Sequence, residues 1–179
     1  MTEAADNSIV VGVDGSEASL AALRWAAEQA RSMHADVIAV HAWEPAGARF
    51  ASYAPVPVRP TAAEQRAEAA RMLAAAVREV LGPRSGRSIR VVVVEGPPAR
   101  VLPARASGAL LLALGRSAYA QRELPALGTV GRACVRCATV PVVMVPVAPD
   151  PAAPSAAAPE AGRQAPGRPA RAPRPVCAG

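Results

Sequence analysis

Five short apolar runs, with helical patterns or loops between them, constrain the fold of this chain more than any other feature. Each run is nearly continuous Val, Ile, Leu and Ala without polar alternation, which is typical of strands buried on both faces. Strands that alternate with helices through right-handed crossovers form a parallel sheet. We therefore expect an α/β fold: a doubly wound, open, five-stranded, mostly parallel, Rossmann-like sheet with helices on both faces. The runs are residues 9–13, 37–42, 89–94, 109–114 and 142–147.

The segments between these runs carry helix start signals. Ser16 is a predicted N-cap of a first helix, and Thr61 with Glu64 has the capping-box spacing that starts a second one. A third helix is expected to be short or kinked, because Pro103 falls in its interior. A fourth helix is expected over residues 129–137.

Length and composition predict one folded domain, over residues 1–148, followed by a tail. Residues 149–179 are dominated by Pro, Ala and Arg without any aromatic residue. Such a segment buries too little apolar surface to offset its ordering entropy, so we expect a disordered tail. The N-terminus lacks the pattern of a signal peptide, and no apolar stretch reaches membrane-spanning length. We expect a cytoplasmic protein with no membrane partner.

We attribute the positive net charge to a bias in amino-acid composition and not to a binding surface. All 20 basic residues are arginines, and the formal net charge is +6. No predicted helix carries a one-sided arginine stripe interleaved with aromatic residues, which nucleic-acid binding would favour. Nucleic acid is therefore not an expected partner.

Three cysteines fit a reducing compartment better than a disulfide framework. Cys134 and Cys137 form a C-x-x-C, but inside the last predicted helix and not at a helix start, where the dipole lowers a thiol pKa. We expect structural cysteines, with a thiol redox protein as an open alternative. No cluster of carboxylates, His or Cys predicts a metal site, and no catalytic arrangement stands out.

Two glycine positions near the end of the domain predict a phosphate site. Gly115 follows the apolar run 109–114, and the pair Gly128–Thr129 precedes the last helix. A glycine at a strand end lets the backbone turn sharply and approach a ligand. A glycine at a helix start leaves backbone N–H groups and the positive end of the dipole available to an anion.

Four motifs in order, IVVGVDGSEAS, VIAVHAWEP, EGPPARVL and LLALG…LGTVGRACVRCATVPVVMVP, resemble the universal stress protein family. The resemblance covers Ser8 to about Val147 and implies the adenine nucleotide alpha hydrolase-like fold. The nucleotide-binding branch of that family carries G-x-x-G, nine residues, then G-[S/T]. Onto this chain these positions fall on Gly115, Ala118 and Gly128–Thr129, so alanine replaces the middle glycine.

The resemblance also implies which residues lie next to the base and the sugar of the nucleotide. It implies that Asp14 lies near the ribose and adenine, that Gly12 lies beneath the base, and that the backbone of Ala42 bonds the adenine edge. The alternative for Asp14 is an Asx turn or cap ahead of Ser16. Arg116 and Arg122 are candidates for phosphate pairing or for solvated loop charges. The expected binding residues are Gly12, Asp14, Ala42, Gly115, Ala118, Gly128 and Thr129.

Two functions remain open. One is a stress-response regulatory protein that binds ATP, with or without magnesium, or a related adenine nucleotide, and the resemblance also implies a homodimer joined through the last strand. The other is a dimeric interaction module of the same fold that has lost nucleotide binding, which Ala118 and Pro103 favour. Neither is an enzyme with dedicated catalytic residues, although slow ATP hydrolysis stays open.

Overall fold

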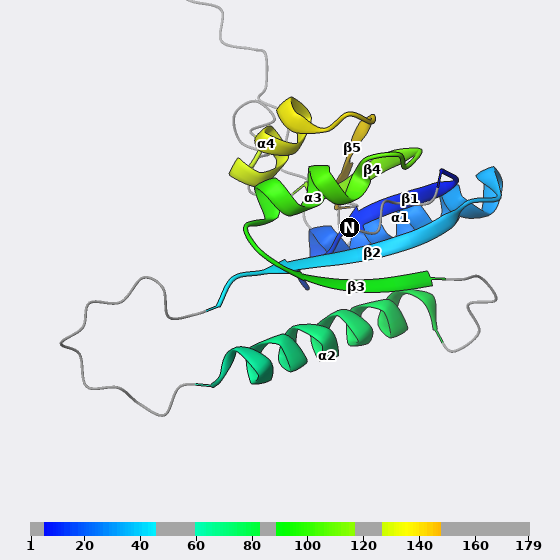
Figure 1. The fold of residues 1–179 in the computed structure, drawn as a ribbon. Helices are drawn as coiled ribbons and strands as arrows, with labels where there is room; N and C mark the ends of the chain where they lie inside the picture. Colours follow the sequence, from blue (N-terminus) through cyan, green and yellow to red (C-terminus); the bar gives the residue numbers. More distant parts are fainter. Residues whose placement is uncertain (1–5, 46–59, 83–88, 117–126, 148–179) are drawn as a thin grey trace, which may run out of the picture. The chain divides into compact units, whose positions relative to one another are not determined.

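A computed structural model describes residues 6–45, 60–82, 89–116 and 127–147 (Figure 1). Five strands form one sheet in the order β3-β2-β1-β4-β5, and every neighbouring pair is parallel. The strands are β1 (Ser8–Gly12), β2 (Asp36–Trp43), β3 (Ile89–Glu95), β4 (Leu111–Arg116) and β5 (Val142–Pro146). The helices are α1 (Glu17–Met33), α2 (Ala62–Leu81), α3 (Pro98–Ala106) and α4 (Thr129–Cys137).

Helices cover both faces of the sheet. On one face, α1 and α2 pack against alternate strand residues such as Ile9 and Val11, with Leu23 and Leu73 fully buried. On the other face, α3 and α4 pack against Val10 and its neighbours. Figure 1 shows α3 and α4 on the side of the sheet opposite α2. The predicted doubly wound fold is confirmed, and the sheet is wholly parallel because every connection is a crossover.

The predicted helix starts are correct where local capping decides them. The Thr61 side chain accepts a hydrogen bond from the backbone N–H of Glu64, and the Glu64 carboxylate accepts one from the backbone N–H of Thr61. These bonds hold the pKa of the Glu64 carboxyl below its usual range. Ser16 caps α1 as predicted, and α3 is short, with Pro103 inside it.

Only β4 differs from its predicted run by more than one residue at an end. The run 109–114 predicts a strand that ends before Gly115, but β4 begins at Leu111 and includes Gly115 and Arg116. The first residues of the run belong instead to a turn, in which Ala109 N donates to Ala106 O. The strand extends further because Gly115 and Arg116 pair with Val145 and Pro146 of β5.

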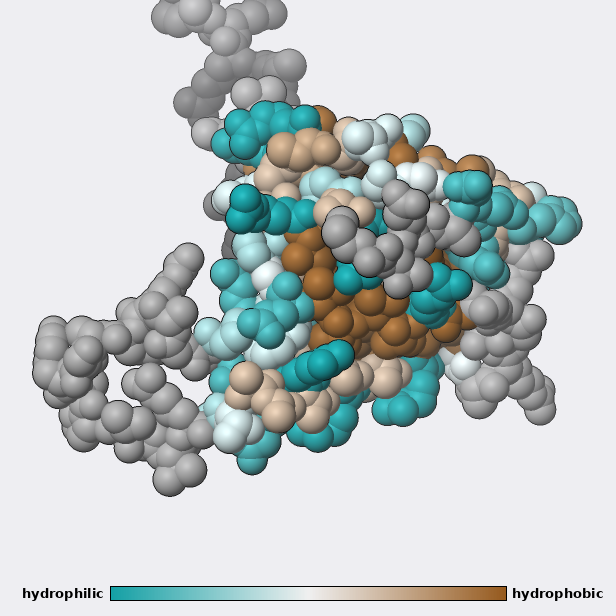
Figure 2. Space-filling view, in the orientation of Figure 1, coloured by the Kyte–Doolittle hydropathy of each residue, from teal (hydrophilic) through white to brown (hydrophobic). Residues whose placement is uncertain are grey.

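The two edges of the sheet are β3 and β5. Figure 2 shows an apolar surface along the β3 edge, where Val91 is 42% exposed. None of the described helices combines the length and apolar character needed to cross a bilayer. The predicted tail, together with Ala118, Arg122 and Cys177, lies outside the described residues.

Candidate functional site

A cavity of about 510 Å³ opens at the carboxyl ends of β1, β2 and β4. The chain leaves β1 toward β2 on one side and reaches β4 on the other, so the strand order reverses between β1 and β4. Open α/β sheets bind ligands at such a reversal. Six of the seven predicted binding residues line this cavity, and Ala118 lies outside the described residues. The six are Gly12, Asp14, Ala42, Gly115, Gly128 and Thr129.

The cavity also has an apolar wall that the motifs do not reveal. Its members come from five different elements, so no single segment of sequence marks them. The face alternation of the strands is the signal that could have found part of the wall, because Val40 shares a face with Ala42, and Leu114 shares one with Leu112. The wall consists of Val40, Pro98, Leu102, Leu114, Val130 and Met144.

Gly12 borders this wall. A Cβ built on Gly12 would lie 2.7 Å from a methyl carbon of Leu114 and 3.0 Å from one of Leu102. Both contacted atoms are the ends of side chains, and both leucines are buried. The absence of a side chain at Gly12 therefore leaves space at this wall of the cavity.

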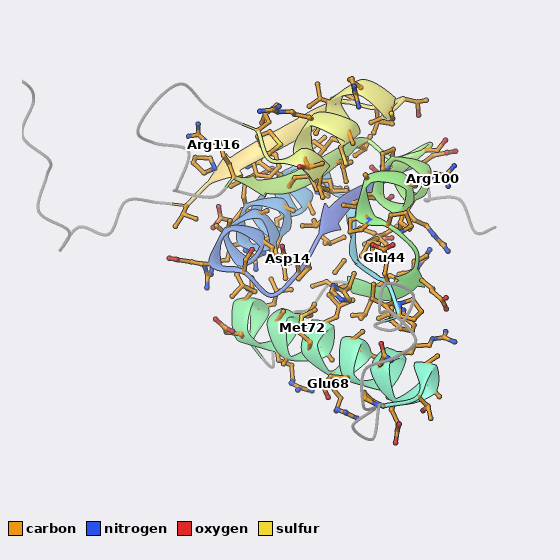
Figure 3. All side chains as sticks on the ribbon, turned by 90° about the vertical axis from the view of Figure 1, so that its left-hand side faces the viewer. Asp14, Glu44, Glu68, Met72, Arg100 and Arg116 are labelled. Carbon is orange, nitrogen blue, oxygen red and sulfur yellow. The ribbon has the colours of Figure 1, made fainter. Side chains whose placement is uncertain are left out.

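Asp14 forms the Asx turn that the sequence left open, and it also lines the cavity. Its Oδ1 accepts from Ser16 N at 3.0 Å and from Ser16 Oγ at 2.6 Å. Partial desolvation raises the pKa of Asp14, but hydrogen bonds from Ser16 and Ser19 outweigh it and hold this pKa below its ordinary value. Figure 3 views this carboxyl edge of the sheet, with Asp14 between β4 and α2. The carboxylate is thus ionised near neutral pH and presents acceptors to the cavity.

Gly115 lies at a close approach of two backbones. A Cβ at this position would lie 2.2 Å from the carbonyl carbon and oxygen of Ala18 and 2.6 Å from Ser19 N. The prediction that Gly115 lets the chain turn sharply is wrong, because the residue continues β4 in an extended conformation. Residue 115 must be glycine because the first turn of α1 packs directly on the strand at this position.

Gly128 has the opposite surroundings. A Cβ built there would meet no described atom within 4 Å, so none of the described residues crowds this position. Gly128 is the N-cap of α4 and supplies no side-chain hydrogen bond to the helix. The first backbone hydrogen bond of this helix runs from Arg132 N to Gly128 O at 3.0 Å. The backbone N–H groups of residues 129–131 therefore have no acceptor within the helix. The N-terminus of α4 therefore offers backbone donors and a positive dipole end to the cavity.

Two further side chains line the cavity with nitrogen atoms. His41 Nδ1 lies 2.7 Å from Val13 O, and because a carbonyl only accepts, Nδ1 carries the hydrogen. Arg116, at the end of β4, is half-buried and brings a guanidinium to the same edge. The cavity therefore combines one carboxylate, one guanidinium and one uncapped helix start.

The cysteines of α4 fit a structural role better than a redox one. Cys134 is fully buried in the core between α3, α4 and the sheet. Burial, with a smaller contribution from Cys137, raises the pKa of the Cys134 thiol to about 11. A reactive thiol needs a lowered pKa, so the geometry disfavours the redox alternative.

Comparisons with known proteins match both the sequence and this fold. A comparison with protein-family models matches residues 7–146 to the Universal stress protein family. No curated protein matches the chain. Three solved structures have the same fold. A universal stress protein in complex with cAMP is 22% identical, with a TM-score of 0.54 over 81% of this chain and 100% of that one.

The second solved structure, a universal stress protein family member from Burkholderia pseudomallei, is 25% identical, with a TM-score of 0.55 over 78% of this chain and 96% of that one. The third, a universal stress protein family protein from Arabidopsis thaliana with AMP bound, is 18% identical, with a TM-score of 0.51 over 81% of this chain and 94% of that one. The family match spans nearly all of the described residues and the sheet order is that of a doubly wound fold. The chain therefore belongs to the universal stress protein family.

Proposed function

We propose that this protein binds an adenine nucleotide in the cavity at the β1/β4 reversal. The observation that carries the proposal is the N-terminus of α4, where Gly128 supplies no side-chain cap and no described atom lies within 4 Å of a Cβ built on it. Helix starts of this kind bind phosphate through backbone N–H groups. A volume of about 510 Å³ is in the range of small-ligand sites.

The proteins of the same fold support the choice of nucleotide. One was solved in complex with cAMP and another with AMP bound. Both ligands carry adenine, ribose and one phosphate. The apolar wall around Gly12 fits a flat base, and the ionised carboxylate of Asp14 fits ribose hydroxyl donors. The backbone of Ala42 is our candidate for the adenine edge.

Arg116 is our candidate for a charge partner of the phosphates. Its guanidinium is always ionised and its fork geometry matches phosphate oxygens. The described residues hold no group of three or more His, Cys, Asp or Glu that would bind a metal ion. A magnesium ion that arrives with ATP would accordingly be held mainly by the phosphates. We propose a binding protein without rapid ATP hydrolysis.

Equilibrium dialysis with labelled AMP and ATP, with and without magnesium, tests the proposal. We expect saturable binding of one nucleotide per chain below millimolar concentration. GTP at the same concentrations serves as the matched competitor and is expected to displace the label poorly. Absence of saturable adenine nucleotide binding below a millimolar would overturn the proposal.

A second candidate function, a module of the same fold that no longer binds nucleotide, has one observation in its favour. Alanine stands at residue 118, where the nucleotide-binding pattern has glycine. If the wild-type chain fails to bind, Ala118→Gly separates two causes. Restored binding would mean that the methyl group impairs an intact site, and no change would favour the interaction module.

The cellular part of the proposal is a cytoplasmic regulator that acts in stress responses as a homodimer joined through β5. β5 is an edge strand, and unpaired edge strands invite pairing with another chain. Sedimentation equilibrium over a wide concentration range tests the dimer. A single species of monomer mass throughout would contradict it.

A further inference from the structure

The two helical layers of the fold carry charge in different ways. In the layer of α1 and α2, acidic residues and arginines are equal in number, since α1 has two of each and α2 has three of each. The two ion pairs that the described residues form both belong to this layer. In the layer of α3 and α4, each helix has two arginines and no acidic residue. The first layer is therefore balanced, and the second is basic.

This asymmetry is more than a matter of composition. All basic residues of the chain are arginines, so a bias toward arginine acts on both layers alike. In α1 and α2 the arginines are accompanied by acidic residues, and in α3 and α4 they are not. A bias in composition therefore accounts for the number of arginines, but not for the place where their charge stays unbalanced.

The arginines of α4 lie on the outer side of the helix. Gly131 and Cys134 are its buried residues. Arg132 and Arg136 are exposed, and because they are four residues apart they lie on one side of the helix. Arg132 Nε donates to Leu127 O at 2.8 Å, and neither arginine pairs with an acidic residue of the described chain. Neither side chain lines the nucleotide cavity.

An exposed apolar side chain lies beside these two arginines. Val135 of α4 is 52% exposed. The neighbouring helix α3 packs against α4 and adds Arg100, which is exposed, and Arg105, which is half-buried. In Figure 3, Arg100 lies on α3, on the side of the sheet away from α2. The outer surface of α3 and α4 thus combines four guanidinium groups with an apolar side chain.

The chain itself does not supply an acidic counterpart for this surface. The segments outside the described residues contain more arginines than acidic residues, and no described helix of a second copy carries an excess of acidic residues. Charge complementarity therefore requires a different molecule. Neither α3 nor α4 has an aromatic side chain on which the bases of a single strand would stack. Arginines next to an exposed valine fit a peptide that has both carboxylates and apolar side chains.

We propose that the outer surface of α3 and α4 binds an acidic segment of a partner protein in which carboxylates alternate with apolar side chains. The carboxylates pair with Arg132 and Arg136, and an apolar side chain packs on Val135. Arginine and carboxylate form two parallel hydrogen bonds in their best geometry, which orients the segment on the helix. This surface is separate from the nucleotide cavity and does not depend on the proposed function.

Fluorescence anisotropy of a labelled peptide of repeated Glu-Glu-Leu units, titrated with the full chain, tests the proposal. We expect saturable binding that weakens about tenfold or more between about 0.05 M and 0.5 M NaCl, because salt screens exposed charges. Arg132→Gln combined with Arg136→Gln is expected to weaken binding about tenfold. The matched control is Arg66→Gln combined with Arg78→Gln, which removes the same charge from exposed positions on α2 and is expected to leave the affinity unchanged.

Two further probes separate the contributions of charge and apolar contact. A peptide of Glu-Glu-Gly units lacks the apolar side chains, so we expect it to bind the wild type more weakly, and Val135→Ser to remove this difference. A labelled single-stranded RNA of the same charge tests nucleic acid in place of protein. All substituted side chains are exposed or half-buried, and far-UV circular dichroism checks that each variant folds. Absence of saturable peptide binding, equal losses in the α4 and α2 double variants, or tighter binding of the RNA than of the peptide would overturn the proposal.

Discussion

The first turns of α1 and α4 lie at the same cavity but are built in opposite ways. In α1, Ser16 Oγ accepts from Ser19 N at 3.2 Å, and Asp14 bonds Ser16 in turn. That turn also packs tightly on Gly115 of β4. In α4, Gly128 offers no side chain, and the space beside it is open. The start of α1 is capped by its own side chains, whereas the start of α4 has no side-chain cap among the described residues.

This difference separates two uses of glycine that look alike in sequence. Gly115 is required by folding, because any Cβ would strike the backbone of Ala18. Gly128 is not required by the packing of the described residues, so its value lies in what it leaves exposed. Substitutions at the two positions are expected to affect different properties, stability at Gly115 and binding at Gly128.

The largest expected effect follows from Gly115→Ala. The added methyl would lie 2.2 Å from Ala18 backbone atoms, so α1 or β4 must shift. We expect the free energy of unfolding to fall by about 3 kcal/mol, as for severe overpacking. Urea denaturation followed by far-UV circular dichroism measures it. A loss as small as that of a surface substitution would contradict the packing role of Gly115.

Gly128→Asp converts the open helix start into a capped one. The new carboxylate would accept from the first amides of α4 and repel phosphate, so we expect AMP affinity to fall about 100-fold. Stability should rise by about 0.5 kcal/mol, because aspartate caps better than glycine. Isothermal titration calorimetry and urea denaturation measure the two effects.

The matched control is Thr61→Asp, which adds the same charge at the N-cap of α2, away from the nucleotide cavity. We expect AMP affinity to be unchanged there. Equal losses in the two variants would mean that net charge, and not the α4 start, governs binding.

Ser16→Ala tests the self-capped start of α1. It removes the acceptor of Ser19 N and one donor to Asp14, so we expect a loss of about 1 kcal/mol in unfolding free energy. Urea denaturation is again the measurement. An unchanged midpoint would show that the turn is held by its packing on Gly115 alone.

The smallest expected effect is the pH dependence that Asp14 contributes. Its pKa is lowered in the folded protein, so its ionised form adds stability above the unfolded pKa of about 3.9, and this stability is lost as pH falls through the folded pKa. Asp14→Asn keeps the Asx turn without the charge. We expect the wild type to be more stable near pH 6, with the difference shrinking below about pH 4. A difference that is constant from pH 6 to pH 3 would contradict this assignment.

Local signals in the sequence predicted most of the fold. Thr61 and Glu64 are three residues apart, so their capping box is readable without tertiary information, and α4 begins and ends as predicted. The parallel sheet follows from strands that are apolar on both faces. The bounds of β4 were misplaced because pairing, and not the local apolar run, decides them: the strand begins where Leu111 pairs with Ile9 of β1 and ends where Arg116 pairs with Pro146 of β5.

The candidate site was predictable only in part, since several of its features depend on distant contacts. The reason for Gly115 is the backbone of Ala18, far away in sequence, and no local pattern distinguishes a turn glycine from a packing glycine. A second cavity, of about 700 Å³ between the carboxyl end of β2 and the first turns of α2, was missed for the same reason, because α2 creates it by packing over His41 and Trp43. A tryptophan at the end of a strand in a chain poor in aromatics was the available signal.

The most direct test of the central claim is the response of the α4 backbone amides to AMP and to adenosine. In ¹H–¹⁵N spectra of the full chain, we expect AMP to shift the amides of Thr129, Val130 and Gly131 in a saturable way, while adenosine, which lacks phosphate, leaves them nearly unmoved. The capped amide of Glu64 is the control. Unmoved α4 amides at saturating AMP, or equal shifts with adenosine, would contradict the claim that this open helix start binds phosphate.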